Sequence, residues 1–171
     1  VINVGRVSND ELPVVLIDEP ALVSMAVEHF VSRGFRNVSW CDAHMIRQPA
    51  QRGALFVDAL KRAGIECGTL ARERRSKREN WSVHRKWLFS RLKLLAQPHG
   101  IFCWDDSEAA NLIEACHAAH LGIPEDVAVL GVNNDELVCE TLRVPLSRRQ
   151  IRRKQGQRFE NRQKKTSRQM Q

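Results

Sequence analysis

Short apolar runs alternate along the chain with stretches whose apolar positions recur every three or four residues. The short runs predict buried strands, and the longer periodic stretches predict amphipathic helices. Strands are expected at residues 13–18, 37–41, 65–70, 100–104 and 127–132. Helices are expected at residues 20–33, 49–63, 81–97 and about 107–119, with Gly34 and Gly64 as stops after the first two. The pattern contains no internal repeat.

Strands with continuous apolar runs, each followed by a helix, are typical of a parallel sheet that is covered on both faces. We therefore expect an α/β fold built around a doubly wound parallel sheet. In such sheets, ligands bind beyond the carboxyl ends of the strands, near the point where the strand order reverses. Candidate functional residues are therefore the polar ones that directly follow predicted strands.

Short carboxylate and amide side chains follow several of the predicted strands, at Asp18, Asp105, Asp106, Asn133 and Asn134. If the strands are parallel, these side chains gather at one edge of the sheet. Carboxylates and amides bond well to hydroxyl groups, so this edge favours a neutral polyhydroxyl ligand. A structural role stays open for each residue alone, since Asp105 is also placed to cap a helix and Asn133-Asn134 to form a turn.

Two tryptophans, Trp40 and Trp104, end or follow predicted strands. Either indole could stack on the C–H face of a sugar ring at the same edge. We take Trp104 as the candidate ligand-binding residue. The alternative for both is packing in the core.

His117 and His120 are three residues apart on one predicted helix, but no third ligand is spaced to join them, so we expect a solvated pair and no metal site.

The net charge of +7 is concentrated at one end of the chain. Residues 147–171 contain ten Lys or Arg and one Glu, whereas residues 1–146 contain 17 basic and 19 acidic side chains. The hydrophobic fraction of 43% is enough for a packed core in residues 1–146. The basic character therefore belongs to the last 25 residues.

Five cysteines without C-x-x-C spacing favour reduced thiols in a cytoplasmic protein. No apolar stretch approaches the ~18 residues of a membrane span, and no secretion signal opens the chain. The sequence has no nucleophile elbow, phosphate loop or dinucleotide fingerprint, so we expect neither an enzyme nor a cofactor. Asp105 and Asp106 could act as a hydrolase pair, but no other feature supports that hypothesis.

Two stretches, LPVVLID…AVEHFVSRGFRNVSW and above all GIFCWDDSEAANLIEACHAAHLGIPEDVAVLGVNNDE, resemble the sugar-sensing domain of the lac-repressor/gal-repressor family of bacterial regulators. That domain is similar in fold to periplasmic sugar-binding proteins. The segment GVNNDELVCETLRVPLS is similar to xylose-operon regulators in particular. The resemblance runs from about residue 1 to residue 147, and IPEDVAVLGV is its most specific part.

The resemblance implies ligand-binding roles for individual residues. Asp18 matches the acidic residue after the strand of the first lobe, and Arg52 matches an arginine that reaches ligand hydroxyls in relatives. Asp106 matches the aspartate of an Asn-Asp pair in which this chain has Asp105 in place of Asn. Asn133 stands where relatives usually carry an aspartate that bonds sugar hydroxyls. An amide there keeps a donor and an acceptor but loses charge-assisted bonds.

The resemblance also implies two lobes with a sugar held between them. On this chain, residues 1–34 are expected to be a remnant of the first lobe, 35–146 the second lobe, and 147–171 a basic tail. We expect the chain to be truncated at both ends. In full-length form the family implies a homodimer that binds DNA through a domain absent from these 171 residues, where no helix-turn-helix pattern occurs.

The basic tail has two interpretations. It could be a weak nucleic-acid-binding arm, in which phosphates would be neutralised by residues such as Arg148, Arg149, Arg152, Arg153 and Lys154. It could instead be a disordered extension, since its few apolar residues show no periodic face. We favour the second interpretation, and an out-of-frame origin of the tail also stays open.

These observations favour a cytoplasmic sugar-sensing domain of a transcriptional regulator, with a pentose such as xylose as its allosteric effector. A periplasmic-type sugar carrier is the alternative, because it shares the fold. A third hypothesis is nucleic-acid binding through the tail, which predicts loss of binding when residues 147–171 are removed.

Overall fold

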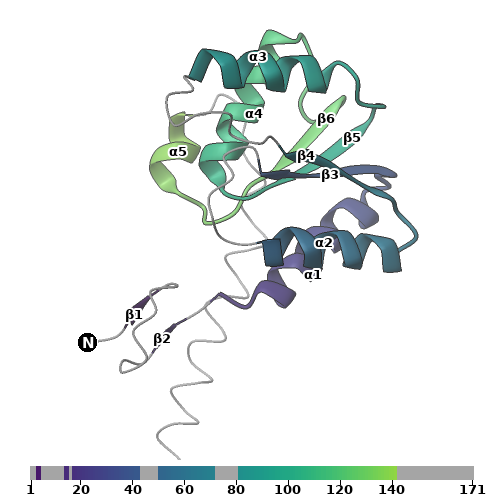
Figure 1. The fold of residues 1–171 in the computed structure, drawn as a ribbon, viewed down its shortest axis with the longest axis vertical. Helices are drawn as coiled ribbons and strands as arrows, with labels where there is room; N and C mark the ends of the chain where they lie inside the picture. Colours follow the sequence, from purple (N-terminus) through teal and green to yellow (C-terminus); the bar gives the residue numbers. More distant parts are fainter. Residues whose placement is uncertain (1–2, 5–13, 16, 43–49, 72–80, 142–171) are drawn as a thin grey trace, which may run out of the picture.

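The computed structural model describes residues 3–4, 14–15, 17–42, 50–71 and 81–141 of the 171-residue chain. The basic tail and the charged segment at residues 72–80 lie outside these ranges. Strands and helices alternate along the chain, as the apolar pattern predicts (Figure 1). In the described ranges no helix is both long and apolar enough to cross a membrane.

Four parallel strands form the main sheet, in the order β4-β3-β5-β6. They are β3 (Asn37–Asp42), β4 (Cys67–Ala71), β5 (His99–Cys103) and β6 (Val127–Leu130). Every residue of β5 and β6 is buried, which is why these strands, apart from His99, are continuous apolar runs rather than alternating ones. A separate small sheet pairs β1 (Asn3–Val4) with β2 (Val14–Val15), also in parallel.

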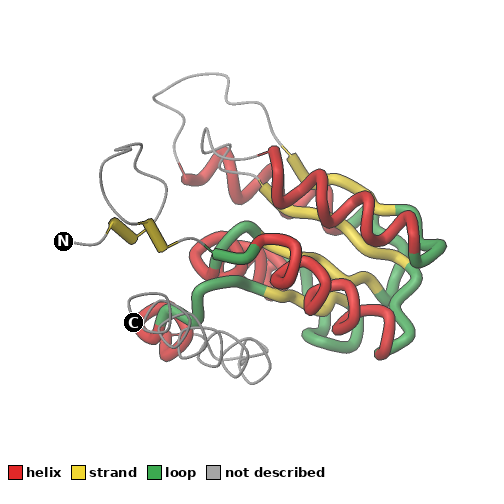
Figure 2. The backbone as a smooth tube through the Cα atoms, turned by 90° about the horizontal axis from the view of Figure 1, so that it is seen from below, coloured by secondary structure: helices red, strands yellow, loops and turns green. Residues whose placement is uncertain are grey.

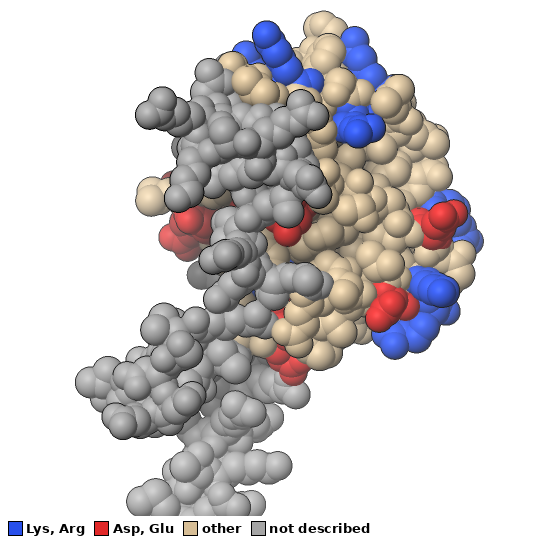
Figure 3. Space-filling model, viewed as in Figure 1, with Lys and Arg blue, Asp and Glu red and all other residues tan. Residues whose placement is uncertain are grey.

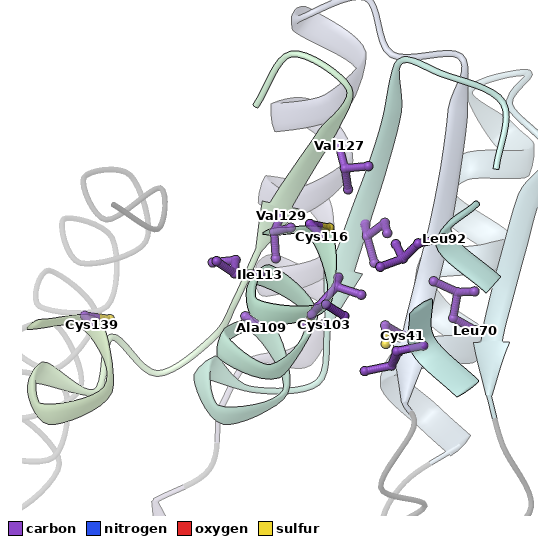
Figure 4. Packing of buried hydrophobic residues seen from close by; sticks show 14 residues of the cluster. Cys41, Leu70, Leu92, Cys103, Ala109, Ile113, Cys116, Val127, Val129 and Cys139 are labelled. Atoms are coloured by element: carbon purple, nitrogen blue, oxygen red, sulfur yellow. The ribbon is translucent and has the colours of Figure 1, made fainter. Parts of the chain in front are cut away.

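Helices cover both faces of the main sheet (Figures 1 and 2). On one face lie α1 (Glu19–Ser32) and α2 (Ala50–Arg62), whose apolar side chains share a cluster with Val38, Trp40 and Phe102 of the strands. On the other face, α3 (Trp81–Leu92) and α4 (Asp106–Ala118) share a second cluster with the alternate strand residues. Figure 4 shows this second cluster, which Cys139 of α5 (Glu136–Thr141) extends. The expected α/β class and doubly wound parallel sheet are confirmed.

Helix α1 packs on the main sheet. Phe30 is fully buried and lies edge-on to Phe56 of α2, with ring centroids 6.3 Å apart. A Cβ added to Gly100 of β5 would lie 2.5 Å from the Phe30 ring, so the helix meets the sheet very closely there. Helix α1 thus shares a core with β3 and β5, and the division of the chain into lobes at residue 34 stays a prediction.

Several element ends differ from expectation by a few residues. Helix α3 ends at Leu92 rather than at 97, because the next turn tightens to hydrogen bonds that span three residues, from Leu94 N to Arg91 O and from Leu95 N to Leu92 O. The apolar period continues through Leu94 and Leu95, which explains the longer expectation. Strand β4 starts two residues later than expected and extends to Ala71, and β6 ends two residues earlier.

The strand order places a switch point between β3 and β5. From β3 the chain crosses to β4 on one side, and it then returns to β5 on the other side of β3. In sheets of this kind the crevice at the carboxyl ends of such a strand pair is where ligands bind. This edge carries the candidate functional residues.

Candidate functional site

Polar residues and one tryptophan lie at the carboxyl ends of β3, β5 and β6. We call this edge of the sheet the rim, and it consists of Asp42, Trp104, Asp105, Asp106, Asn133 and Asn134. The Trp104 N–H donates to the carbonyl of Cys41 at 3.1 Å, which continues the β3–β5 pairing one step beyond the strand. Asp42 is the last residue of β3 and is half-buried. The rim therefore surrounds the switch point.

Asp105 caps α4, as expected from the sequence. Its backbone is extended, and its Oδ1 accepts a hydrogen bond from the Glu108 N–H at 2.8 Å. The carboxylate lies at the positive end of the α4 dipole, where negative charge is favourable. Asp105 remains half-buried, so a cap and a ligand contact are compatible at this residue.

Asp106 hydrogen-bonds the segment after β6 to the start of α4. It is only 4% exposed, and its Oδ2 accepts the Asp135 N–H at 2.7 Å. The carboxyl group also bonds the Asn134 backbone. Burial raises the pKa of this carboxyl, the charges of Asp105 and Asp135 raise it further, and the backbone N–H groups oppose the shift. A Cβ at Gly131 would collide with Asp106 Oδ1, so a larger residue does not fit there.

Asn133 and Asn134 turn the chain from β6 toward α5. Both have left-handed backbones, with φ of 97° and 55°. Asparagine tolerates this region better than most residues because its short amide can bond locally. Asn133 is exposed and Asn134 half-buried, so the turn leaves the Asn133 side chain at the surface of the rim.

Arg52 and Glu19 form a buried ion pair next to Trp104. Arg52 Nε donates to Glu19 Oε2 at 2.6 Å and Nη2 donates to Oε1 at 2.9 Å. Arg52 Nη1 donates to the Trp104 carbonyl at 2.7 Å, and its guanidinium carbon lies 4.1 Å from the centroid of the Trp104 ring. Asp18, the residue before Glu19, caps α1 by accepting the Ala21 N–H at 3.1 Å.

The structure brings five of the six expected ligand-binding residues to one edge of the main sheet. Trp104, Asp105, Asp106 and Asn133 belong to the rim itself. Arg52 reaches it through the Trp104 carbonyl. Asp18 instead lies between β2 of the separate small sheet and α1, which it caps. Whether these residues bind a ligand stays a prediction. The five basic residues named in the tail lie outside the described residues.

Sequence analysis missed Asp42 and Glu19. Asp42 directly follows the run predicted as a strand, which is the signal that selected Asp105, and it was overlooked. Glu19 follows Asp18 at the start of a helix and has no local feature that distinguishes it from an ordinary first-turn acid. Only its pairing with Arg52, 33 residues away, makes it notable.

Within the described ranges, no group of three or more His, Cys, Asp or Glu side chains is arranged to hold a metal ion. No disulfide joins the five cysteines. Burial raises the pKa of the Cys116 thiol to about 12 and that of Cys103 well above its usual value, so both remain protonated. Protonated thiols are poor nucleophiles and poor metal ligands.

A sequence profile for the periplasmic binding protein-like domain matches residues 27–154. Among curated proteins, the xylose operon regulatory protein of Haemophilus influenzae is similar, with 27% identity over 147 residues. These residues cover 79% of this chain and 35% of that protein, so the chain spans about a third of the length of this relative.

Solved structures with a similar fold include a LacI family transcriptional regulator from Arthrobacter sp. FB24 in complex with lactose. It has a TM-score of 0.70 at 20% identity, and the match covers 85% of this chain and 52% of that one. The xylose-binding transcription activator xylR has a TM-score of 0.69 at 19% identity, covering 85% of this chain and 39% of that one. At these identities the likeness concerns the fold alone.

Proposed function

Because the chain belongs to the periplasmic binding protein-like family, we propose that it is the ligand-sensing part of a bacterial DNA-binding transcriptional regulator, and that its ligand is a sugar. The rim carries this proposal, since it places hydroxyl-binding side chains and an indole together at the switch point of the sheet. The names of the relatives support a regulator rather than a periplasmic carrier or an enzyme. A pentose such as xylose is the effector that we propose on the same basis.

The rim residues differ in the roles that their contacts permit. Asp105, Asn133 and Asp42 offer carboxylate and amide oxygens to sugar hydroxyls, and Trp104 offers an aromatic face to the sugar ring. Asp106 and Asp18 accept backbone N–H groups, and we propose that they order the rim beneath the ligand. Because Asn133 is neutral, affinity depends more on the two carboxylates than it would with an aspartate at residue 133.

Sensing follows from the difference in sugar affinity between an open and a closed arrangement. A sugar that contacts this rim and a facing lobe stabilises the closed arrangement by its extra contacts there. Closure then changes the geometry of attached DNA-binding domains. In this mechanism the full regulator acts in the cytoplasm as a homodimer.

The test is a titration of the 171-residue chain with D-xylose, followed by the backbone amide resonances. We expect weak, saturable binding in the millimolar range, because the described rim contacts one side of a ligand only. The resonances that shift should belong to residues 104–106 and 133–135. Saturable shifts at the opposite end of the sheet, around Gly122, would contradict the proposal, as would the absence of a response to any pentose or hexose.

A matched pair of variants sharpens this test. Asp42→Asn removes one carboxylate from the rim, and Glu125→Gln removes one from an exposed residue before β6, at the other end of the sheet. We expect Asp42→Asn to weaken D-xylose binding by about 5- to 10-fold, since it replaces a charge-assisted hydrogen bond with a neutral one. Glu125→Gln should leave the affinity unchanged.

A further inference from the structure

The side chain of Arg52 is buried and is hydrogen-bonded to other residues of the protein. The residue is 3% exposed, and the bonds to Glu19 and to the Trp104 carbonyl use N–H groups of all three of its nitrogens. These bonds use three of the five N–H groups of the guanidinium. A bidentate carboxylate contact of this kind fixes the plane and the position of the guanidinium.

The position of Arg52 in its helix is unfavourable by itself. It lies in the first turn of α2, which contains no acidic residue, so its positive charge adds to the positive end of the helix dipole. Glu19 compensates this charge from the first turn of α1, where a carboxylate is favourable. The pair therefore joins the N-terminal ends of two helices at the rim.

Trp104 is held on more than one side by this arrangement. The Arg52 guanidinium stacks on the ring at 4.1 Å, and the Trp40 ring meets it edge-on at 6.3 Å with an interplanar angle of 89°. The backbone of Trp104 is fixed by its own N–H to the Cys41 carbonyl and by its carbonyl to Arg52. Trp104 is nevertheless only half-buried, so part of its surface still meets solvent at the rim.

We propose that Arg52 is a positioning residue for Trp104. Glu19, Arg52 and Trp104 form a clamp in which the ion pair fixes the indole as a stacking surface for a sugar ring. The clamp itself depends only on the contacts within the chain, whereas the stacking role rests on the proposed sugar function. A rigid aromatic surface binds a ring with little loss of side-chain entropy, and this is the advantage that the clamp provides.

The first measurement follows the indole N–H resonance of Trp104 in the 171-residue chain. Trp104→Phe identifies this resonance by its loss. We expect Glu19→Gln to shift or broaden it, because the guanidinium loses its charged partner and no longer holds the ring. The control is Glu28→Gln, which removes an exposed carboxylate from the same helix and should leave the resonance in place.

Arg52→Lys supplies a second variant in case Glu19→Gln does not fold. Lysine keeps the charge but has no planar fork for the bidentate pair and the stacked contact, so we expect the same change in the Trp104 resonance. An unchanged resonance in both folded variants would overturn the clamp. This outcome does not depend on whether any sugar binds.

The second measurement is a double-mutant cycle on D-xylose affinity. We expect Glu19→Gln to weaken binding by about 3- to 10-fold in the wild-type chain and to have no further effect in a Trp104→Ala background. Equal weakening in both backgrounds would overturn the positioning role, because the effect of Glu19→Gln would then not pass through Trp104. A changed resonance with unchanged affinity would overturn the stacking role. If the wild-type chain binds no sugar, the proposed function and the stacking role both fail, while the resonance still decides the clamp.

Discussion

The packing around the rim leaves room only for glycine at residue 53. Gly53 follows Arg52 in α2, and a Cβ at this position would lie 2.7 Å from Nε1 of the Trp40 indole. Trp40 is itself buried between Phe56 and Phe102 and has little room to move. The close approach of α2 to β3, which puts Arg52 beside Trp104, therefore requires glycine at residue 53.

We expect Gly53→Ala to lower the free energy of unfolding by about 1 to 2 kcal/mol, because overpacking outweighs the gain in helix propensity. Urea denaturation measures the change. The comparison variant is Ala54→Gly at the exposed neighbour, which should cost about 1 kcal/mol through propensity alone. A stabilised Gly53→Ala protein would show that the helix and the strand do not approach this closely.

At the scale of elements, the N-terminal end of α4 combines two tasks. Asp105 completes the helix with its side chain, and the same residue lies on the rim next to Trp104. Glu108, three residues later, is 1% exposed and lies within 3.7 Å of the Cys41 thiol of β3. The first turn of α4 therefore contacts β3 directly.

The cap is testable apart from any ligand. Asp105→Ala should lower the free energy of unfolding by about 1 kcal/mol, since the Glu108 N–H loses its acceptor. Asp105→Asn should cost less, because the amide oxygen can still accept that bond. Thermal unfolding followed by circular dichroism distinguishes the two. Ser107→Ala, at an exposed residue of the same turn, should change stability by less than about 0.5 kcal/mol.

At the scale of the whole molecule, stability should depend on pH through a buried histidine. His99 opens β5 at the end of the sheet away from the rim, with Nε2 2.8 Å from Ser39 Oγ and Nδ1 3.1 Å from the Ala96 carbonyl. Burial lowers the pKa of His99 below its usual 6.5, and the bond to Ala96 partly opposes this. The folded protein therefore binds a proton at His99 less readily than the unfolded chain.

The contribution of His99 to stability is complete above the unfolded pKa and is lost as the pH falls through the folded pKa. Between about pH 7.5 and 5.5 we expect the free energy of unfolding to decrease, by at most about 1.4 kcal/mol per pH unit from this group. His99→Gln should remove this part of the slope in urea titrations. His117→Gln, at an exposed residue of α4, should leave it intact; equal slopes in all three proteins would rule out His99 as the source.

Much of the fold follows from local patterns in the sequence. The alternation of strands and helices, the left-handed stops at Gly34 and Gly64, and the Asp105 cap are all properties of a few neighbouring residues. Most rim residues could also be predicted by selecting the polar residues that directly follow each predicted strand, because parallel strands bring their carboxyl ends to one edge. Asp42 directly follows the strand predicted at residues 37–41, so the same criterion also selects it.

The class of fold, the family and the edge of the sheet that carries the polar residues could be predicted from the order of amino acids. These features depend on hydrophobic period, turn chemistry and a recognisable stretch of residues, which are local properties of the chain. The strand order, the packing of α1 on the main sheet and the partners of Arg52 depend instead on contacts between distant segments. Glu19 and Trp104 lie 33 and 52 residues from Arg52 in the sequence, and only the packed fold brings them within hydrogen-bond distance of it.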